Sequence, residues 1–289
     1  MYSAVDALIA DGTPFVTEIC EILAVSRSAY YAWRVAKITE HDSADARLLP
    51  MIRTAFRRHR RRYGARRIAS DLRDIGIMCG PRRIGRLMKT QGLMAIQPKS
   101  FKPRTTESRH RLGYSPNLLL DSQEVTDINQ VIVGDITYIP LEGGTFSYLA
   151  MLMDRFSRRI IGWHLGVDMT EDLVLEALRM AVRQTQMPAG LIHHTDRGGQ
   201  YAGTAYRSLL RRAGVRQSMS RAGNCYDNAF MESCYGTLKT ELEMSEYDNH
   251  RAAMRALNEY LPYYNTQRKH SALGYVTPAQ FESRRVSPK

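Results

Sequence analysis

The sequence predicts an α/β domain with a mixed β-sheet and helices on both faces, preceded by small all-α modules. Two observations support this prediction. Between residues 130 and 243, strand-like segments are followed by helices and strands in alternation, whereas before residue 96 the apolar residues recur at helical spacing. At 289 residues the chain exceeds one typical domain, so we expect a core of about 150 residues and one or two smaller units.

Composition excludes several classes of protein. A hydrophobic fraction of 44% is ordinary for a folded chain, no apolar run reaches the roughly 18 residues of a membrane span, and the N-terminus lacks a signal-peptide pattern. We therefore expect a cytoplasmic protein without a membrane partner. The four cysteines are scattered with no C-x-x-C pair, which argues against a disulfide framework or a zinc ribbon and predicts reduced thiols.

The net charge of +12 is concentrated in one segment. Residues 53–111 contain 18 Lys or Arg and 3 Asp or Glu, a net charge of +15, so the rest of the chain has a net charge of −3. Such concentration indicates a phosphate-binding surface, because neutralised phosphates release their counterions. A solubilising surface is the alternative, but it usually mixes both signs of charge. We expect nucleic acid as the partner.

Residues 1–50 are expected to form a helix-turn-helix-like module. Apolar residues from Val16 to Leu23 predict one helix, and Ser26 is a suitable N-cap for a second helix that carries Arg27 and Trp33. Small helical hairpins that do not bind DNA share this pattern, so both roles remain open.

Residues 51–95 are expected to form a basic helical DNA-binding module, with one helix ending at Gly76 and another beginning at Pro81. The predicted apolar faces contain Ile68, Leu72, Ile75, Ile84, Leu87 and Met88. The candidate DNA contacts are Arg66, Arg67, Arg82, Arg83, Arg86 and Lys89. Residues 96–124 contain prolines and no apolar periodicity, which predicts an extended basic linker.

Residues 125–245 are expected to form the α/β core. Strands are predicted at residues 130–140, 144–154, 158–167, 191–196 and 215–220. Helices are predicted at residues 170–186, 205–214 and 228–243. The order βββαβαβα is the pattern of a ribonuclease-H-like domain. Residues 246–289 are expected to form a helical extension, in which Pro262 should interrupt or kink a helix at residues 249–267.

Three carboxylates are placed to converge at one edge of the predicted sheet. Asp135 lies within the first strand, Asp196 follows the fourth strand, where glycines permit a sharp turn, and Glu232 lies in the last helix of the core. Each acid alone has a structural alternative, as an edge-strand, turn or solvated helix residue. Their joint placement favours phosphodiester chemistry.

Phosphodiester cleavage needs an activated nucleophile and a neutralised leaving oxygen, and two divalent ions about 3.5 to 4 Å apart provide both. Asp and Glu oxygens suit Mg²⁺ or Mn²⁺. We assign Asp135 as the ligand that bridges the two ions, with Asp196 on one ion and Glu232 on the other. Lys239 lies two helical turns after Glu232 on the same face, so it is a candidate contact for a DNA phosphate.

His193 and His194 precede Asp196 and invite a zinc interpretation. Adjacent strand residues point to opposite faces of a sheet, however, so both histidines cannot readily bind one ion. We expect one of them in the core and the other near the site.

Four segments resemble the integrase core of the OrfB-type transposases of the IS3 family of bacterial insertion sequences: VGDITYIP, HHTDRGGQYAG, SMSRAGNCYDNAFMESCYGTLKTE and YYNTQRKHSALGYVTPAQFE. The 35 residues between Asp196 and Glu232 also match the DDE spacing shared with retroviral integrases. Two upstream segments, YAWR and RYGARRIASDL, are similar to upstream parts of the same family. The resemblance therefore covers nearly the whole chain.

The resemblance implies a DNA transposase that cleaves at terminal inverted repeats and joins the ends to target DNA through attack by a 3′-hydroxyl. It also implies that Asp135, Asp196 and Glu232 form the catalytic triad. Further candidates for substrate contact, by motif, are Asn224, Tyr226, Asn228 and Lys239. Gly199 and Cys234 depart from the family pattern, and neither departure affects a carboxylate.

The reaction and the resemblance also imply partners. Two DNA ends must be joined together, so we expect at least a dimer on double-stranded DNA, associated with the bacterial nucleoid. Members of the family usually act as a fusion with an upstream OrfA-type segment that carries a leucine zipper, and this sequence has no heptad run. Two rival functions stay open: a ribonuclease-H-like nuclease, and a non-catalytic DNA-binding regulator that has no use for the triad.

Overall fold

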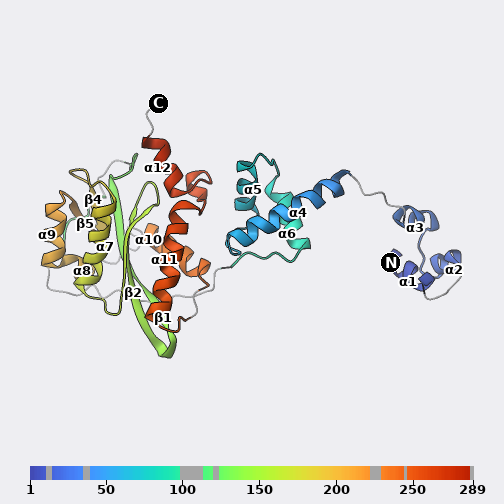
Figure 1. Ribbon diagram of the computed structural model, residues 1–289, viewed down its shortest axis with the longest axis horizontal. Helices are drawn as coiled ribbons and strands as arrows, with labels where there is room; N and C mark the ends of the chain where they lie inside the picture. Colours follow the sequence, from blue (N-terminus) through green and yellow to red (C-terminus); the bar gives the residue numbers. More distant parts are fainter. Residues whose placement is uncertain are drawn as a thin grey trace.

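The computed structural model describes residues 1–10, 15–34, 40–97, 113–119, 124–221, 229–243 and 246–286. Three bodies follow one another along the long axis of the molecule: an N-terminal helical unit, a second helical module and a core built on a sheet (Figure 1). The candidates Asn224, Tyr226 and Asn228, and most of the predicted linker, lie outside the described residues. Within the described residues, no helix is both long and apolar enough to cross a lipid bilayer.

The N-terminal unit consists of α1 (Tyr2–Ala10), α2 (Val16–Ile22) and α3 (Arg27–Arg34). Its apolar cluster is formed by Val5, Ile19, Cys20 and Tyr30. The predicted helix pair and its cap are confirmed, because the Ser26 hydroxyl accepts a hydrogen bond from the Ala29 N–H at 3.4 Å. The sequence does not predict α1, since the segment YSAVDALIA is apolar at most positions and has no clear helical period.

The second module consists of α4 (Glu40–Arg58), α5 (Ala65–Asp74) and α6 (Pro81–Thr90). Helix α4 runs across the boundary expected between residues 50 and 51. Its buried residues Leu48, Ile52, Ala55 and Phe56 pack with the two predicted helices in one apolar cluster. The helical pair predicted from the sequence, α5 and α6, is therefore part of a three-helix module that α4 completes.

The ends of α5 and α6 follow the sequence prediction. Gly76 has a positive φ of 82° just after α5, and Pro81 is the first residue of α6. Ile75, predicted on the apolar face, is instead 65% exposed. The reason is that α5 ends one residue earlier, so Ile75 no longer follows the helical stripe.

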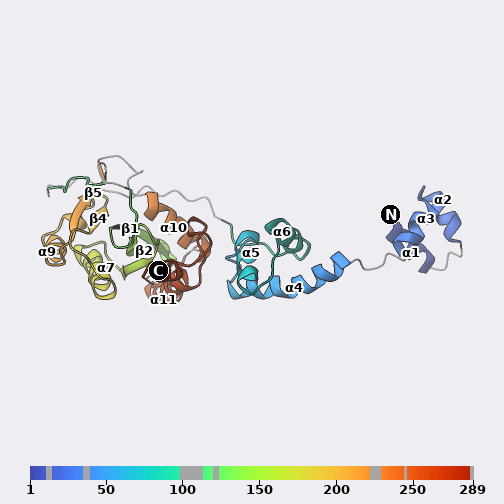
Figure 2. The same cartoon turned by 90° about the horizontal axis from the view of Figure 1, so that it is seen from above.

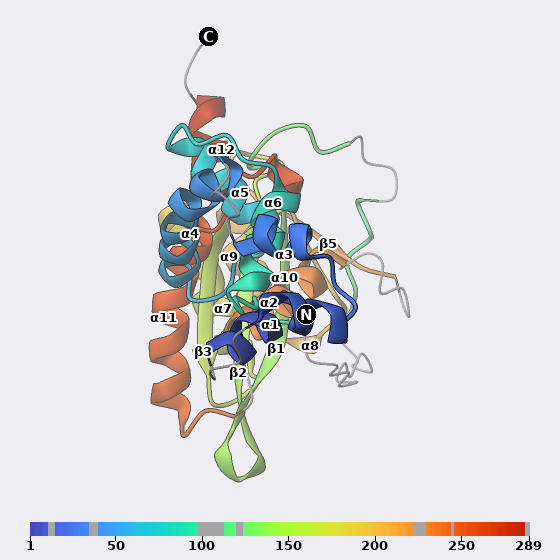
Figure 3. The same cartoon turned by 90° about the vertical axis from the view of Figure 1, so that its right-hand side faces the viewer.

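The core contains a five-stranded sheet in the order β3-β2-β1-β4-β5. Its strands are β1 (Val131–Leu141), β2 (Thr145–Asp154), β3 (Ile160–Gly166), β4 (Ile192–Thr195) and β5 (Arg216–Met219). Strand β1 is antiparallel to β2 and parallel to β4, so the sheet is mixed, as predicted. The hairpin of β1 and β2, closed by η1 (Glu142–Gly144), extends beyond the helices (Figures 1 and 3).

Helices cover both faces of this sheet (Figure 2). One face is covered by α7 (Glu171–Gln184), α8 (Gly199–Ala202) and α9 (Thr204–Arg212), and the other by α10 (Ala229–Glu241) and α11 (His250–Thr266). The chain ends with η3 (Ser271–Leu273) and α12 (Pro278–Val286). The strands and helices predicted for the core are present, and the described residues also contain two short helices that the sequence did not predict, η1 and α8.

Helix α11 continues through Pro262, where the sequence predicts an interruption or a kink. Proline removes one backbone hydrogen bond from a helix. The residues around it, Leu257, Tyr260, Leu261 and Tyr264, are buried against the sheet and α10. The predicted interruption does not occur, because the packing of this apolar face holds the helix together across the missing bond.

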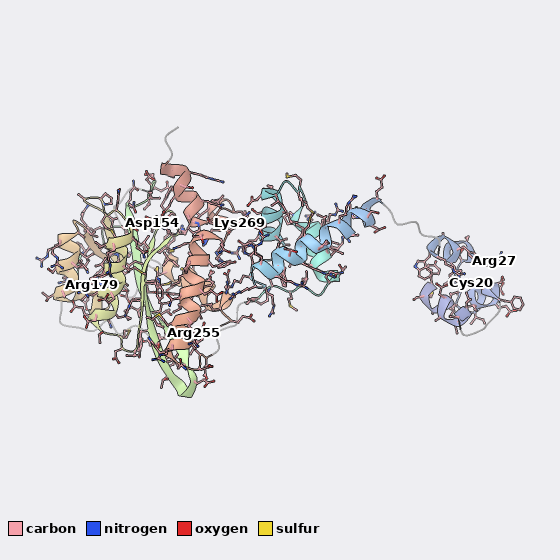
Figure 4. All side chains as sticks on the ribbon, in the orientation of Figure 1. Cys20, Arg27, Asp154, Arg179, Arg255 and Lys269 are labelled. Atoms are coloured by element: carbon pink, nitrogen blue, oxygen red, sulfur yellow. The ribbon has the colours of Figure 1, made fainter. Side chains whose placement is uncertain are left out.

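The second module is joined to the core through buried polar contacts. The Tyr63 hydroxyl donates to the Gln267 carbonyl at 2.9 Å and accepts from the Lys269 N–H at 2.8 Å. The Lys269 ammonium donates to the Ser70 hydroxyl at 3.0 Å, and Figure 4 shows Lys269 on the side of the core that faces the module. By contrast, the described residues of the N-terminal unit make no hydrogen bond or ion pair to the other two bodies, and Figure 1 shows it apart from them.

Candidate active site

Asp135 lies in the middle of β1, on the face of the sheet that α10 covers. Val131, Val133 and Ile139 lie on the same face of the strand as Asp135, because they are separated from it by even numbers of residues. They belong to the apolar cluster that includes α10 and α11. The backbone carbonyl of Asp135 accepts a hydrogen bond from the Tyr235 hydroxyl at 2.5 Å. Helix α10 is therefore tied to β1 at the residue that carries the first candidate carboxylate.

Asp196 lies directly after β4, the parallel neighbour of β1. The parallel register pairs Val133 with His194. Asp135 and Asp196 each follow two residues after this pair, so they lie side by side, on neighbouring chain segments about 4.8 Å apart. Its carboxylate accepts a hydrogen bond from the Gly198 N–H at 2.9 Å. A Cβ at position 198 would lie 2.9 Å from Gln200 Oε1 and 3.0 Å from Asp196 Oδ1, both at the ends of side chains, and Gly198 has a φ of −59° that other residues also adopt.

Glu232 lies in the first turn of α10 and is exposed. It precedes Tyr235 by three residues, so both lie on one side of the helix, and Lys239 continues this row one turn further on. The charge of Asp135 reaches Lys239: burial lowers the pKa of the Lys239 ammonium, and Asp135 partly offsets that effect. The row of Glu232, Tyr235 and Lys239 thus borders β1 at Asp135.

The field at this edge of the sheet is negative. Burial raises the pKa of the Tyr201 and Tyr235 hydroxyls well above the usual range, and the charges of Asp135 and Asp196 raise both further. Two buried phenols therefore remain protonated beside the two aspartates. A cation would lower the free energy of this arrangement.

The three carboxylates do not form a closed cluster. Among the residues that the structure describes, no three His, Cys, Asp or Glu side chains lie close enough together to hold one metal ion. The geometry brings Asp135 and Asp196 to neighbouring strands and places Glu232 on the adjacent helix.

Models of known families match most of the chain. Two models described as an integrase core domain match residues 126–225 and 213–278, and a model described as an HTH-like domain matches residues 43–101.

Known proteins are similar over almost the full length. A transposase for insertion sequence IS3A from Escherichia coli K12 is 36% identical over 94% of this chain and 95% of its own length. The chain belongs to the IS3 family of insertion-sequence transposases. A 31 kDa protein of insertion element IS600 from Shigella sonnei is 42% identical over 92% of this chain, and a transposase of element IS904 from Lactococcus lactis is 41% identical over 80%. The protein is thus a DDE-type DNA transposase, which decides against the nuclease and the regulator.

Chains of two solved structures are similar to parts of the transposase at low sequence identity. A chain of a simian T-cell lymphotropic virus intasome is 19% identical, with a TM-score of 0.48 over 78% of the transposase and 72% of that chain. The catalytic core domain of HTLV-2 integrase, solved in complex with magnesium, is 17% identical, with a TM-score of 0.43 over 53% of the transposase and 96% of that chain.

The two histidines before Asp196 are core residues of the transposase. His193 Nε2 lies 2.7 Å from the Tyr206 hydroxyl, and His194 Nδ1 lies 2.8 Å from the Ser218 hydroxyl. Both rings are fully buried, and burial lowers the pKa of His193 to about 3. The two rings have separate partners and both lie in the core, whereas the expectation that one of them also lies near the site stays a prediction.

The predicted DNA contacts of the transposase divide into two groups. Arg83 donates to Asp45 at 2.6 Å, Arg86 pairs with the same carboxylate, and Arg67 lies 3.4 Å from Glu241. The other three of the six candidates are Arg66, Arg82 and Lys89. They are exposed and form no ion pair with any described residue. The sequence count treated all six as equivalent, because the acidic partners lie far away along the chain.

Sequence reasoning missed Tyr235 and Glu241, the two residues of α10 that anchor this helix. Glu241 is buried, and the Arg268 Nε donates to both of its carboxylate oxygens at 2.9 Å. The spacing of Tyr235 from Glu232 and Lys239 places the three on one helical side, and this was the available signal. No sequence signal pairs Glu241 with Arg268, which is 27 residues away.

Proposed function

We propose that Asp135, Asp196 and Glu232 bind two divalent metal ions, Mg²⁺ or Mn²⁺, where the transposase cleaves element ends and joins them to target DNA. The supporting observation is the adjacency of Asp135 and Asp196 on parallel neighbouring strands, with α10 tied to Asp135 through Tyr235. Carboxylate oxygens are the ligands that these ions prefer. When bound, two such ions activate the attacking oxygen and neutralise the departing one.

The chain's own residues complete the chemistry. The carboxylates of Asp135 and Asp196 lie on neighbouring strands and suit divalent cations. Glu232 reaches the two aspartates from the first turn of α10 when DNA and ions are bound. Lys239, on the same side of α10, binds a phosphate of the DNA strand and holds it in line with the carboxylates.

The other bodies bind DNA in this proposal. Residues 1–34 and 40–95 act as DNA-binding modules, residues 96–124 join the second module to the core, residues 125–245 carry the chemistry and residues 246–289 brace the core. Two element ends react together, so the active form is at least a dimer on double-stranded DNA. An upstream OrfA-type partner supplies further end recognition, and the reaction takes place in the bacterial cytoplasm.

Substitution of the carboxylates tests the metal site. Asp135→Asn, Asp196→Asn and Glu232→Gln should each lower strand transfer on terminal-repeat DNA with Mg²⁺ by about a thousandfold, because several kcal/mol of transition-state stabilisation are lost. Removing the metal with EDTA should stop the reaction and leave DNA binding intact. The control is Asp172→Asn, an exposed acid at the start of α7. Strand transfer that survives all three substitutions, with DNA affinity unaltered, contradicts the proposal.

Exposed and paired arginines of the second module give a second test. Arg82→Ala with Lys89→Ala should weaken DNA binding and lower its salt slope by about two, because two phosphate contacts are lost. Arg83→Ala should mainly destabilise the module, since it leaves Asp45 with one partner fewer. Equal salt slopes for the wild type and the first variant would place the DNA elsewhere.

A further inference from the structure

The turn between β2 and β3 carries three arginines whose partners differ. Arg159 donates to the Glu282 carboxylate at 2.8 Å. Arg155 and Arg158, both half-buried, form no ion pair with any residue that the structure describes. Their guanidinium groups instead lie over the ring of Phe230, 4.9 and 4.1 Å from its centroid.

The nearest carboxylate, Asp154, is occupied by the backbone. Its Oδ1 accepts from the N–H groups of Phe156 at 2.9 Å and Ser157 at 2.7 Å, and its Oδ2 accepts from the Asn129 N–H at 2.8 Å. Asp154 is 1% exposed, so these donors compensate a buried charge. The carboxylate of Asp154, which Figure 4 labels, therefore fixes the shape of the turn at this end of the sheet. Among the described residues, it forms no ion pair with Arg155 or Arg158.

Two like charges lie close together and partly out of water. Burial lowers the pKa of Arg155 and of Arg158; at Arg158, Tyr264 and the charge of Asp154 partly offset this effect, and the charge of Arg155 adds to it. A cation–π contact orders a guanidinium but does not neutralise it. Two ordered guanidinium groups match the oxygen atoms of a phosphate group, which arginine binds through paired hydrogen bonds.

The position of the pair relates it to the candidate active site. Phe230 lies in the first turn of α10, two residues before Glu232. Residues two apart in a helix are separated by roughly 200°, so Phe230 and Glu232 lie on opposite sides of α10. The arginines therefore lie across α10 from Glu232, at about 10 Å, the width of one helix, which is close to the rise of three nucleotides in a DNA strand.

We propose that Arg155 and Arg158 form a binding site for a phosphodiester group of the DNA strand that enters the active site, a few nucleotides from the bond that is cleaved. The proposal rests on the proposed function, because it takes DNA at Glu232 as given. The site holds the strand by its backbone and carries no sequence information. It also adds a DNA contact to a part of the chain that has no excess of positive charge in the sequence.

The test is a double variant, Arg155→Gln with Arg158→Gln, titrated with a terminal-repeat duplex between about 0.05 and 0.2 M salt. We expect the slope of log affinity against log salt to fall by about one to two, and the KM of strand transfer to rise with kcat kept. The matched control is Arg179→Gln with Arg183→Gln, which removes two exposed charges from α7, where Arg179 pairs with Glu176 (Figure 4). Its slope should stay at the wild-type value.

An unchanged slope in the folded double variant overturns the proposal, and so does an equal loss in the control. If the double variant does not melt near the wild type, the single variants decide, each with an expected loss of about one in the slope. Arg155→Lys with Arg158→Lys should keep most of the slope, a result that a mere packing role does not give. Failure of the proposed function is distinct, because it appears as strand transfer that persists in the Asp135→Asn variant.

Discussion

The two helical bodies that precede the core each have three helices among the described residues, and they differ in attachment. The N-terminal unit closes its own small cluster around Tyr30, and its described residues contact neither of the other bodies through a hydrogen bond or an ion pair. The second module has its own cluster too, but it is also joined to the core by the ion pairs Arg67–Glu241 and Lys269–Asp71. Both bodies are helical, and only the structure shows that the second module is docked on the core whereas the described residues of the N-terminal unit are not.

The junction is centred on Glu241, at the end of α10. Its carboxylate accepts from Arg268 at 2.7 and 2.9 Å, from the Tyr260 hydroxyl at 3.0 Å and from Arg67 of the module at 3.4 Å. Glu241 and Arg268 are 7% and 4% exposed. Buried ions of this kind require every partner, because a lone charge left inside a protein is costly. The helix that carries Glu232 and the DNA-binding module therefore depend on the same carboxylate.

Among the changes that test how differently the two helical bodies are attached, loss of the Glu241 charge should have the largest effect on stability. Glu241→Gln leaves Arg268 buried without its counter-charge, and we expect the free energy of unfolding of the core to fall by about 3 to 5 kcal/mol. Denaturant unfolding followed by circular dichroism measures it. The control is Glu259→Gln, which removes an exposed partner of Arg60 and should cost no more than about 0.5 kcal/mol. Equal costs for the two variants would show that the junction is an ordinary surface contact.

Loss of the Tyr30 ring should affect only the N-terminal unit. Tyr30 is fully buried and donates to Asp6 at 2.5 Å, so Tyr30→Ala should cost about 3 kcal/mol, comparable to the whole stability of so small a unit. Calorimetry should show its transition disappear while the main transition stays in place. Tyr31→Ala, at a 46% exposed neighbour, should leave both transitions nearly unchanged. A main transition that moves with Tyr30→Ala would mean that the bodies are coupled.

Acid should destabilise the core before it affects the N-terminal unit. Burial lowers the pKa of both His193 and His270 to about 3, against roughly 6.5 in an unfolded chain. Below pH 6.5 the unfolded chain therefore binds protons that the folded core does not, and stability falls as the pH drops from 6.5 toward 3. The loss is up to about 1.4 kcal/mol per pH unit for each histidine.

Melting curves between pH 7.5 and 5 check this sign. Residues 1–34 contain no histidine, so the transition of the N-terminal unit should not shift by this mechanism. His270→Asn should flatten the pH dependence of the core. A core that gains stability on acidification would contradict the buried neutral state of both rings.

The sequence predicted the core closely because its local patterns agree with its tertiary structure. The strand around Asp135, the glycine turn after Asp196 and the helix around Glu232 each carry a strong local signal, and the spacing of the acids follows from them. The six basic side chains predicted to bind DNA show the opposite case. Arg67 and Arg83 are similar to Arg82 in sequence, yet their partners Glu241 and Asp45 are 174 and 38 residues away. No local pattern encodes such pairs.

Helix α4 and Pro262 show two further limits. Helix α4 carries a proline in its interior, and its buried residues pack in one cluster with α5 and α6. Pro262 lowers the local preference for helix, and the buried face of α11 overrides that preference. In both cases tertiary packing decides what the local sequence leaves undetermined.

The contacts between Tyr63 and the segment after α11 also set an order of events during synthesis. The Tyr63 hydroxyl and the Gln267 carbonyl are 204 residues apart in the chain. At roughly 5 to 20 residues per second, the ribosome needs about 10 to 40 s after the second module has been made to reach the segment on which the module docks. A chain that ends before that segment retains its basic helices, but the second module cannot dock on the core. The docked arrangement is thus available only to a nearly complete polypeptide.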